Sequence, residues 1–388
     1  MSPFSAIFVP DELADALSDR SWLAAMLDAE RALAHAESVA GVVPAAAAAA
    51  VAAACDPSLY DVADLAVAGR VAGNPAEPLV RALRERVGDE HAASVHRGAT
   101  SQDVVDTAAM LVASRALRLV DAELEGVANE CARLAAEHRH SVMAARTLLQ
   151  QAVPTTFGFK AAGWLVGLVE TRARLVEVAA SLPAQLGGAA GTLAALGGDG
   201  PEVLRLYAAE LGLREPIVPW HTIRTPVAEL AGALAAVAGV TAKIAGDIVL
   251  LAQTEVGEVA ERDAGGSSTM PHKRNPTSAV LAVACARHAR ANAGLLFESV
   301  VAEHERAVGA WHAEWHALAT ALAATGGAAA AVRRSLTGLE VDVARMRANI
   351  VPETLAEAHR FGIDVQDPDG YLGSADAFVD RALTLYSK

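Results

Sequence analysis

The chain has 388 residues, a hydrophobic fraction of 53%, an aromatic fraction of 4% and a formal net charge of −14. This length exceeds the usual size of one hydrophobic core, so we expect two or three structural segments. The negative charge argues against nucleic acid as a partner, because lysine and arginine supply the affinity for phosphates, but it leaves room for a small anionic substrate in a locally positive site.

Neither a targeting segment nor a membrane span is expected. The N-terminus lacks a basic region followed by an uninterrupted apolar core, so the protein is predicted to be cytoplasmic. Its apolar stretches are rich in alanine, and charged residues interrupt them, whereas a spanning helix needs about 20 residues nearly free of charge. The three cysteines are far apart, without metal-ligand spacing, and are expected to be buried thiols: Cys55, Cys131 and Cys285.

The predicted elements are almost all helices. An apolar stripe predicts a helix from about residue 20 that ends near Gly41, and Pro44 opens a second, alanine-rich helix. Further helices are predicted at about residues 100–140, 155–181, 227–261, 275–305 and 312–338. No alternating strand pattern of convincing length is present. After a Pro/Gly/Asp linker, Ser374 is predicted to cap one short amphipathic helix at the C-terminus.

Helices of this length predict an all-α bundle. At about 1.5 Å per residue they reach roughly 40 to 50 Å, so each must bury a long apolar face against other helices or other subunits. We therefore expect a homo-oligomer. In the predicted helix 227–261, Gly232, Gly239 and Gly246 recur every seventh residue. Because glycine weakens a helix by about 1 kcal/mol, this recurrence indicates a seam where a neighbouring helix approaches closely.

Three polar stretches interrupt the helical pattern: "VHRGATSQDVVDT" (95–107), "ARTLLQQAVPTTFG" (145–158) and "GGSSTMPHKRNP" (265–276). Each lies at a predicted helix start, where unpaired backbone N–H groups favour anions, so several such ends together would make a carboxylate site. Taken singly, Thr100 and Ser101 fit plain N-caps better than binding residues.

The third stretch is predicted to be a mobile lid that carries a serine acid/base. Gly265 and Gly266 permit backbone conformations closed to other residues. Ser267 and Ser268 offer hydroxyl groups, and Lys273 and its neighbours add cationic and amide donors that could stabilise an oxyanion. The alternative interpretation is a solvated linker, which has little use for Met, His, Lys and Asn between two prolines.

In this order, the three stretches resemble the signature regions of the fumarase/aspartase superfamily, and the resemblance extends over residues 1 to about 345. It implies an all-α, long-helix fold in a homotetramer with a twenty-helix core. Each active site would be assembled from three subunits, with no cofactor and no metal. The implied segments are an N-terminal helical domain (1–97), a central long-helix bundle (98–341) and a shortened C-terminal segment (342–388).

Within the superfamily, the chain is most similar to the 3-carboxy-cis,cis-muconate cycloisomerases, through stretches such as "FGFKAAGWL", "QLGGAAGTLAALG" and "PWHT". Leu148 stands where adenylosuccinate lyases carry a histidine, and Asn74 is the counterpart of another. Releasing an amine requires a proton donor, whereas a carboxylate attacks or departs without one. The resemblance thus implies addition of a substrate carboxylate across a double bond, giving 4-carboxymuconolactone in aromatic catabolism through the β-ketoadipate pathway.

The resemblance also assigns roles to residues. Ser267 would exchange a proton at the carbon next to a carboxylate, while Lys273 and Asn275 would stabilise the enolate-like intermediate. The residues implied to bind the small polycarboxylate substrate are Thr100, Ser101, His96, Arg146, Ser268, Met270, His221 and His304.

Three alternatives remain open from the sequence. The first is a related lyase with a weakly basic leaving group, such as a nitrosuccinate lyase. The second is an enzyme like the adenylosuccinate lyases, which share the first and third stretches. The third is a non-catalytic helical scaffold, supported only by the shortened C-terminal segment.

Overall fold

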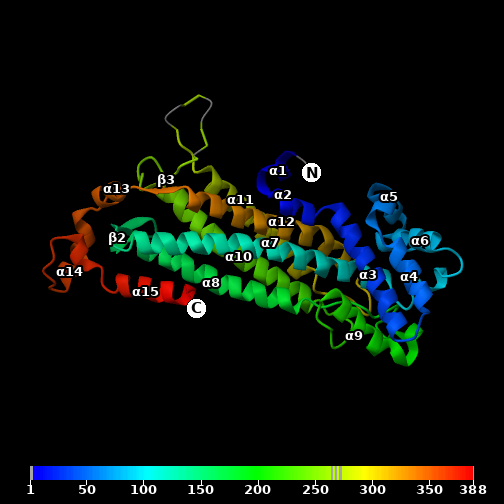
Figure 1. Cartoon of the computed structure of the whole chain (residues 1–388). Coiled ribbons are helices and arrows are strands. Elements are labelled where there is room, and N and C mark those ends of the chain that lie inside the picture. Colours follow the sequence, from blue (N-terminus) through cyan, green and yellow to red (C-terminus); the bar gives the residue numbers. More distant parts are fainter. Residues whose placement is uncertain (1–2, 264, 267–268, 271–272, 388) are drawn as a thin grey trace.

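The computed structural model describes residues 3–263, 265–266, 269–270 and 273–387. It is an elongated helical bundle (Figure 1), and the all-α expectation is confirmed. The helices of the first half are α1 (Pro3–Phe8), α2 (Asp11–Ala16), α3 (Asp19–Val39), α4 (Ala45–Ala54), α5 (Val62–Ala72), α6 (Ala76–Val87), α7 (Ser101–Glu137) and α8 (Phe157–Ser181). Those of the second half are α9 (Gly200–Leu211), α10 (Thr225–Leu251), α11 (Thr277–Glu298), α12 (Ala310–Thr337), α13 (Val343–Ala348), α14 (Ala356–Arg360) and α15 (Ala375–Tyr386).

Five long helices, α7, α8, α10, α11 and α12, pack side by side and form the body of the molecule (Figure 1). Their facing positions are filled by fully buried aliphatic side chains, among them Leu124, Leu165, Leu234 and Leu322. A second core lies at the end that carries α3, α4, α6 and α9 (Figure 1). Many alanines in these cores let the helices approach closely, which explains how so few aromatic residues suffice.

Two of the long helices, α10 and α12, are long and apolar enough to span a membrane by length and composition alone. Both pack against other helices of the bundle, as core helices do in a soluble protein. The three cysteines are free and buried, as predicted. Of the three glycines in the predicted seam along α10, only Gly232 lies near another helix, since a Cβ there would meet Phe297 of α11 at 3.8 Å. A Cβ at Gly239 or Gly246 would meet no described residue within 4 Å.

The structure corrects the sequence prediction at one important place. Residues 145–158 do not simply open a helix, because β1 (Val142–Thr147) and β2 (Gln150–Thr156) form an antiparallel hairpin before α8. The turn between the strands is Leu148–Leu149, both with positive φ, so the Asn-Gly or Asp-Gly signal of such a turn is absent. Pro154 in β2 further weakens the strand pattern.

Helix ends also differ from the predicted boundaries. Helix α10 ends at Leu251, ten residues before the predicted end, and the chain then turns through Gly257, whose φ of +62° favours glycine. The strand β3 (Val259–Glu261) follows and pairs with β4 (Leu339–Val341). Ser374 precedes α15 as predicted, but its side chain makes no cap hydrogen bond.

Candidate active site at two ends of the bundle

The candidate site residues fall into two groups at opposite ends of the helical body, and four of them were not among the predicted site residues: Asp103, Leu148, Glu258 and Arg306. We call the first the α7 cluster: Thr100, Ser101, Asp103, His221 and Arg306. We call the second the hairpin cluster: Arg146, Leu148, Glu258, Lys273 and Asn275. Helix α7 has 37 residues, so about 55 Å separates its first turn from the hairpin that follows its last. A single chain does not bring the two groups together.

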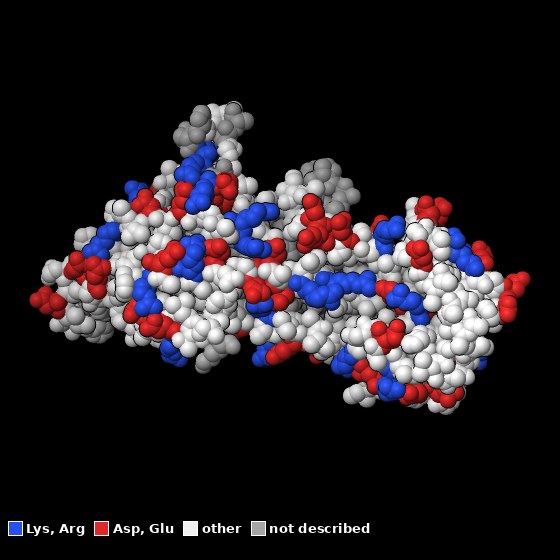
Figure 2. All heavy atoms as spheres, in the orientation of Figure 1, with Lys and Arg blue, Asp and Glu red and all other residues white. Residues whose placement is uncertain are grey.

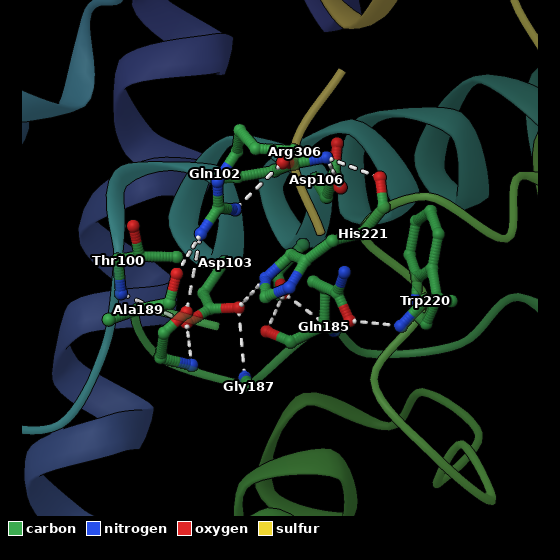
Figure 3. Close-up of polar contacts among 12 residues, drawn as sticks. Thr100, Gln102, Asp103, Asp106, Gln185, Gly187, Ala189, Trp220, His221 and Arg306 are labelled. Atoms are coloured by element: carbon green, nitrogen blue, oxygen red, sulfur yellow. Dashed lines mark hydrogen bonds and ion pairs between the residues drawn. The ribbon is translucent and has the colours of Figure 1, made fainter. Parts of the chain in front are cut away.

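Asp103 is the centre of the α7 cluster (Figure 3). Its carboxylate is buried and accepts hydrogen bonds from the backbone N–H groups of Thr100, Gly187 and Gly188, each at 2.9 Å. The fourth contact joins Asp103 Oδ1 to His221 Nε2 at 2.6 Å. The backbone bonds fix the carboxylate at the first turn of α7, as an acidic residue in a capping box does.

The glycines of this cluster are required by close packing. A Cβ at position 187 would lie 2.8 Å from His221 Cε1, and one at position 188 would lie 2.6 Å from the carbonyl oxygen of Gly98. Gly188 also has a φ of +69°, which disfavours other residues. The loop "LGGAA" is thereby pressed against Asp103 and His221, which explains its glycine pair.

A buried ionic network lies next to the α7 cluster. Arg224 donates to Asp106 Oδ2 at 2.7 Å and to Glu314 Oε1 at 2.9 Å, and all three side chains are at least 95% buried. Burial raises the pKa of Glu314, although its hydrogen bond with Arg224 opposes this. Trp311 Nε1 donates to Asp106 Oδ1. This network links α7 and α12 to the start of α10. It therefore holds the helices that carry the α7 cluster in fixed positions.

Arg306 is a residue that the sequence reasoning missed. Its guanidinium donates to Gln102 Oε1 at 2.8 Å and to the carbonyl oxygens of Ala189 and Gly188 at 2.8 and 3.4 Å (Figure 3). All three acceptors are neutral, and no carboxylate among the described residues pairs with this cation. Its positive charge, beside the N-terminus of α7, makes this end of the molecule suitable for an anion. Of the residues in "EHERAV" (303–308), only His304 was predicted to belong to the site.

The two other predicted histidines, His96 and His304, lie at the same end of the molecule as the α7 cluster. His96 Nδ1 contacts Glu30 Oε1 at 2.6 Å, and the Glu30 side chain is buried. Burial lowers the pKa of His96, but the charge and hydrogen bond of Glu30 outweigh it, so the pKa is raised overall. His304 is exposed and has a φ of +48°. His96 is also left-handed, with a φ of 59°, and such strain is more common at functional sites.

In the hairpin cluster, Arg146 is already paired. Its guanidinium binds both carboxylate oxygens of Glu258, at 2.9 and 2.6 Å, and the Glu258 side chain has no exposed surface. Asn349 Nδ2 adds a hydrogen bond to Glu258 Oε1 at 2.8 Å. In this arrangement Arg146 braces the base of the hairpin, while the tip residues Leu148 and Leu149 are 97% and 68% exposed.

The described parts of the third stretch project from the bundle between β3 and α11 (Figure 1). Gly265 and Asn275 pair through two backbone hydrogen bonds of 3.1 Å, and the Asn275 side chain also donates to the Gly265 carbonyl. Glu261, just before, accepts hydrogen bonds from the first N–H groups of α11. Figure 2 shows basic and acidic side chains together at the base of this projection.

The remaining predicted residues of this stretch differ in what can be said of them. Lys273 is exposed, and Met270 is 42% exposed. Ser267 and Ser268 lie outside the described residues. Among the residues that the structure describes, no group of three or more His, Cys, Asp or Glu side chains could hold a metal ion. The described residues of the two clusters offer cations, backbone N–H groups and acid/base side chains.

Comparisons with known proteins place this geometry in a family. A family described as lyase matches residues 9–290. Nitrosuccinate lyase from Streptomyces davaonensis is 48% identical over 349 residues, covering 86% of this chain and 74% of that protein. A 3-carboxy-cis,cis-muconate cycloisomerase from Bradyrhizobium diazoefficiens is 48% identical over 342 residues, covering 86% and 76%. The crystal structure of the 3-carboxy-cis,cis-muconate lactonizing enzyme from Pseudomonas putida matches with a TM-score of 0.93 and 38% identity, covering 100% and 99%.

Proposed function

Because the chain belongs to the lyase family, we propose that it is a cycloisomerase acting on 3-carboxy-cis,cis-muconate, with 4-carboxymuconolactone as product. The observation that carries this proposal is the hairpin tip. At the position after Thr147 the chain presents an apolar, exposed Leu148 and no proton donor. An attacking carboxylate needs no such donor, whereas the departure of an amine does.

We propose that the complete site forms between chains. The α7 cluster offers an uncompensated Arg306 at a helix N-terminus, and the hairpin cluster offers Lys273 and an exposed tip, but the two lie at opposite ends of one chain. In a homotetramer with a twenty-helix core, the five long helices of each subunit would bring unlike ends together. The open glycines of α10, Gly239 and Gly246, would then face helices of a neighbouring subunit.

In this proposal the residue roles follow the chemistry of a polycarboxylate. Thr100, Ser101 and Arg306 bind one carboxylate, with His96, His221 and His304 around them. Lys273 and Asn275, from another chain, stabilise the negative charge that develops on the carboxylate next to the protonated carbon. Ser267 delivers that proton. Ser268 and Met270, which belong to the same stretch of sequence, bind the substrate. The enzyme requires no cofactor and works in the cytoplasm.

A nitrosuccinate lyase is the second candidate, favoured by the relative from Streptomyces davaonensis at 48% identity. Nitrite is a weakly basic leaving group, so the apolar hairpin tip suits this elimination equally well. The two candidates separate in a direct assay. The purified protein is expected to remove the ultraviolet absorbance of the conjugated diene; nitrite release from nitrosuccinate without any diene loss would replace the first candidate by the second.

Ser267→Ala tests the proton-transfer role. We expect turnover to fall by at least about 100-fold, because general acid/base groups contribute about that much or more. Ser299→Ala is the matched control, since Ser299 is a buried serine whose hydroxyl donates only to the Leu295 carbonyl within α11. Turnover of the Ser267 variant equal to that of the control would remove Ser267 from the mechanism.

A further inference from the structure

The His221–Asp103 pair is a hydrogen-bonded imidazole and carboxylate to which the proposed function assigns no part in proton transfer. His221 is only 4% exposed, and Asp103 is 1% exposed. Because His221 Nε2 lies 2.6 Å from Asp103 Oδ1, this nitrogen carries a proton and points at the carboxylate. The other ring nitrogen, Nδ1, has no hydrogen-bond partner among the described residues, yet it is not one of the fully buried unpartnered atoms. Nδ1 is thus the end of the ring that can exchange protons.

Lactone formation consumes a proton, which the active site must supply. A carboxylate oxygen of the substrate forms the new C–O bond, and the electron pair of the double bond moves to the carbon next to another carboxylate. That carbon then takes up one proton. Three carboxylates become two carboxylates and an ester, so each turnover consumes one proton from solvent. The group that protonates carbon must be recharged before the next cycle.

We propose that His221 is the proton relay of this site, with Asp103 as its positioning residue. Nδ1 takes up a proton from solvent, and the imidazolium passes it to the group that protonates carbon, which returns His221 to the neutral form. This inference rests on the proposed function for its direction. In an elimination, the same relay carries the abstracted proton outward.

The surroundings of His221 suit a group that gains and loses charge. Asp103 contacts the ring, and the charged side chains nearby are Asp106 from α7, Arg224 just before α10, Glu314 from α12 and Arg306 from the segment before α12. Arg224 is already shared between Asp106 and Glu314, so Asp103 is the carboxylate that faces the ring.

The pair is more than a helix cap. The backbone N–H groups of Thr100, Gly187 and Gly188 already occupy both oxygens of Asp103, so its structural role at the start of α7 does not need an imidazole. A glutamine at position 221 could donate the same hydrogen bond from its amide. What the imidazole adds is a second nitrogen that can accept a proton.

The kinetic test compares His221→Gln with His35→Gln. His35 forms the matched control pair, with Glu210 at 3.2 Å on the exposed surface of α3 and α9, outside both clusters. We expect His221→Gln to lower kcat by about 100-fold with little change in KM, and added imidazole to restore turnover in proportion to its concentration. His35→Gln should resemble the unmodified enzyme. A His221 variant with normal kcat, or one that loses kcat without any rescue by imidazole, would overturn the relay.

A second measurement does not depend on turnover. Diethyl pyrocarbonate acylates neutral imidazole, and peptide mapping by mass spectrometry resolves the rate at His221. We expect diethyl pyrocarbonate to acylate His221 in the unmodified protein between pH 6 and 8, because Nδ1 has no hydrogen-bond partner among the described residues and is not fully buried. Absence of acylation at His221 in this pH range would overturn the inference. If the unmodified enzyme converts neither substrate, the proposed function fails while this measurement still decides the state of His221.

Discussion

The α7 cluster and the hairpin tip satisfy their groups in opposite ways. Asp103 and Asp106 are buried and saturated with hydrogen bonds from the backbone, a histidine, an arginine and a tryptophan. Leu148 and Leu149 are exposed apolar residues held in left-handed conformations, which costs roughly 1–2 kcal/mol per residue. Contacts within the chain preorganise the α7 end of the molecule. The hairpin tip carries strain and an apolar surface that no described residue covers.

This difference indicates how each end affects the free energy of unfolding of the single chain. A saturated polar cluster gains stability within the chain and holds its groups in fixed positions for a ligand. A strained apolar tip loses stability within the chain and gains only when something covers it. The comparison therefore predicts large stability effects at the α7 end and, at the tip, small stability effects with an effect on activity.

The largest effect is expected for Arg224→Met. This change leaves Asp106 and Glu314 buried beside each other without a cation, so the free energy of unfolding should fall by about 3–5 kcal/mol in urea denaturation. The control is Arg205→Met, because Arg205 pairs with Glu202 and both side chains are about half exposed. There we expect little change in the free energy of unfolding, because solvent screens an exposed ion pair. If the two variants lost similar amounts of unfolding free energy, the buried network of Arg224, Asp106 and Glu314 would not have the stabilising role that we assign to it.

The next effect concerns Glu37, which lies on the same helix as Glu30, the partner of His96. Burial raises the pKa of Glu37 to about 8, and repulsion by Glu30 adds to this. Because the pKa is higher in the folded state than the unfolded value near 4.5, Glu37 destabilises the protein progressively as pH rises from about 4.5 to 8.

Glu37→Gln removes that titration. Any constant cost of burying the amide cancels when two pH values are compared, so the variant should gain about 2.5 kcal/mol relative to the unmodified protein between pH 5 and 7. Urea denaturation at both pH values measures the difference. Glu85→Gln, on the exposed side of α6, is the control and should show no such trend. A flat difference for Glu37→Gln would mean that Glu37 stays ionised in the folded protein.

The sequence was most informative where one physical rule dominates. Long apolar periodicity predicted the five helices of the body, and polar residues at helix starts located the three stretches that carry the candidate site. Buried cysteines followed from their spacing and number. In each case the pattern is local, and no distant residue is needed to interpret it.

Other features could not be predicted because they depend on distant partners. Arg146 pairs with Glu258, 112 residues later, so its position in the second stretch could not indicate that its charge is already occupied. Arg306 gains its place beside Gln102 only through the path of the chain after α11. The hairpin was missed because its turn uses two leucines where turn signals consist of glycine and asparagine.

The smallest stability effect, and the sharpest test of the comparison, is Leu148→Asn with Leu149→Gly. Asn-Gly is the preferred pair for a two-residue hairpin turn with positive φ at both positions, so the variant should be about 1 kcal/mol more stable in urea denaturation. If the tip forms an apolar wall of the site in the assembled protein, kcat/KM should nevertheless fall by at least about tenfold, because a methylene-rich contact of this size contributes about 1–3 kcal/mol. Val39→Asn, at a comparably exposed position on α3, should change neither quantity appreciably. A variant that is more stable and fully active would show that the leucines serve neither substrate nor partner, and the strain at the tip would then need another cause.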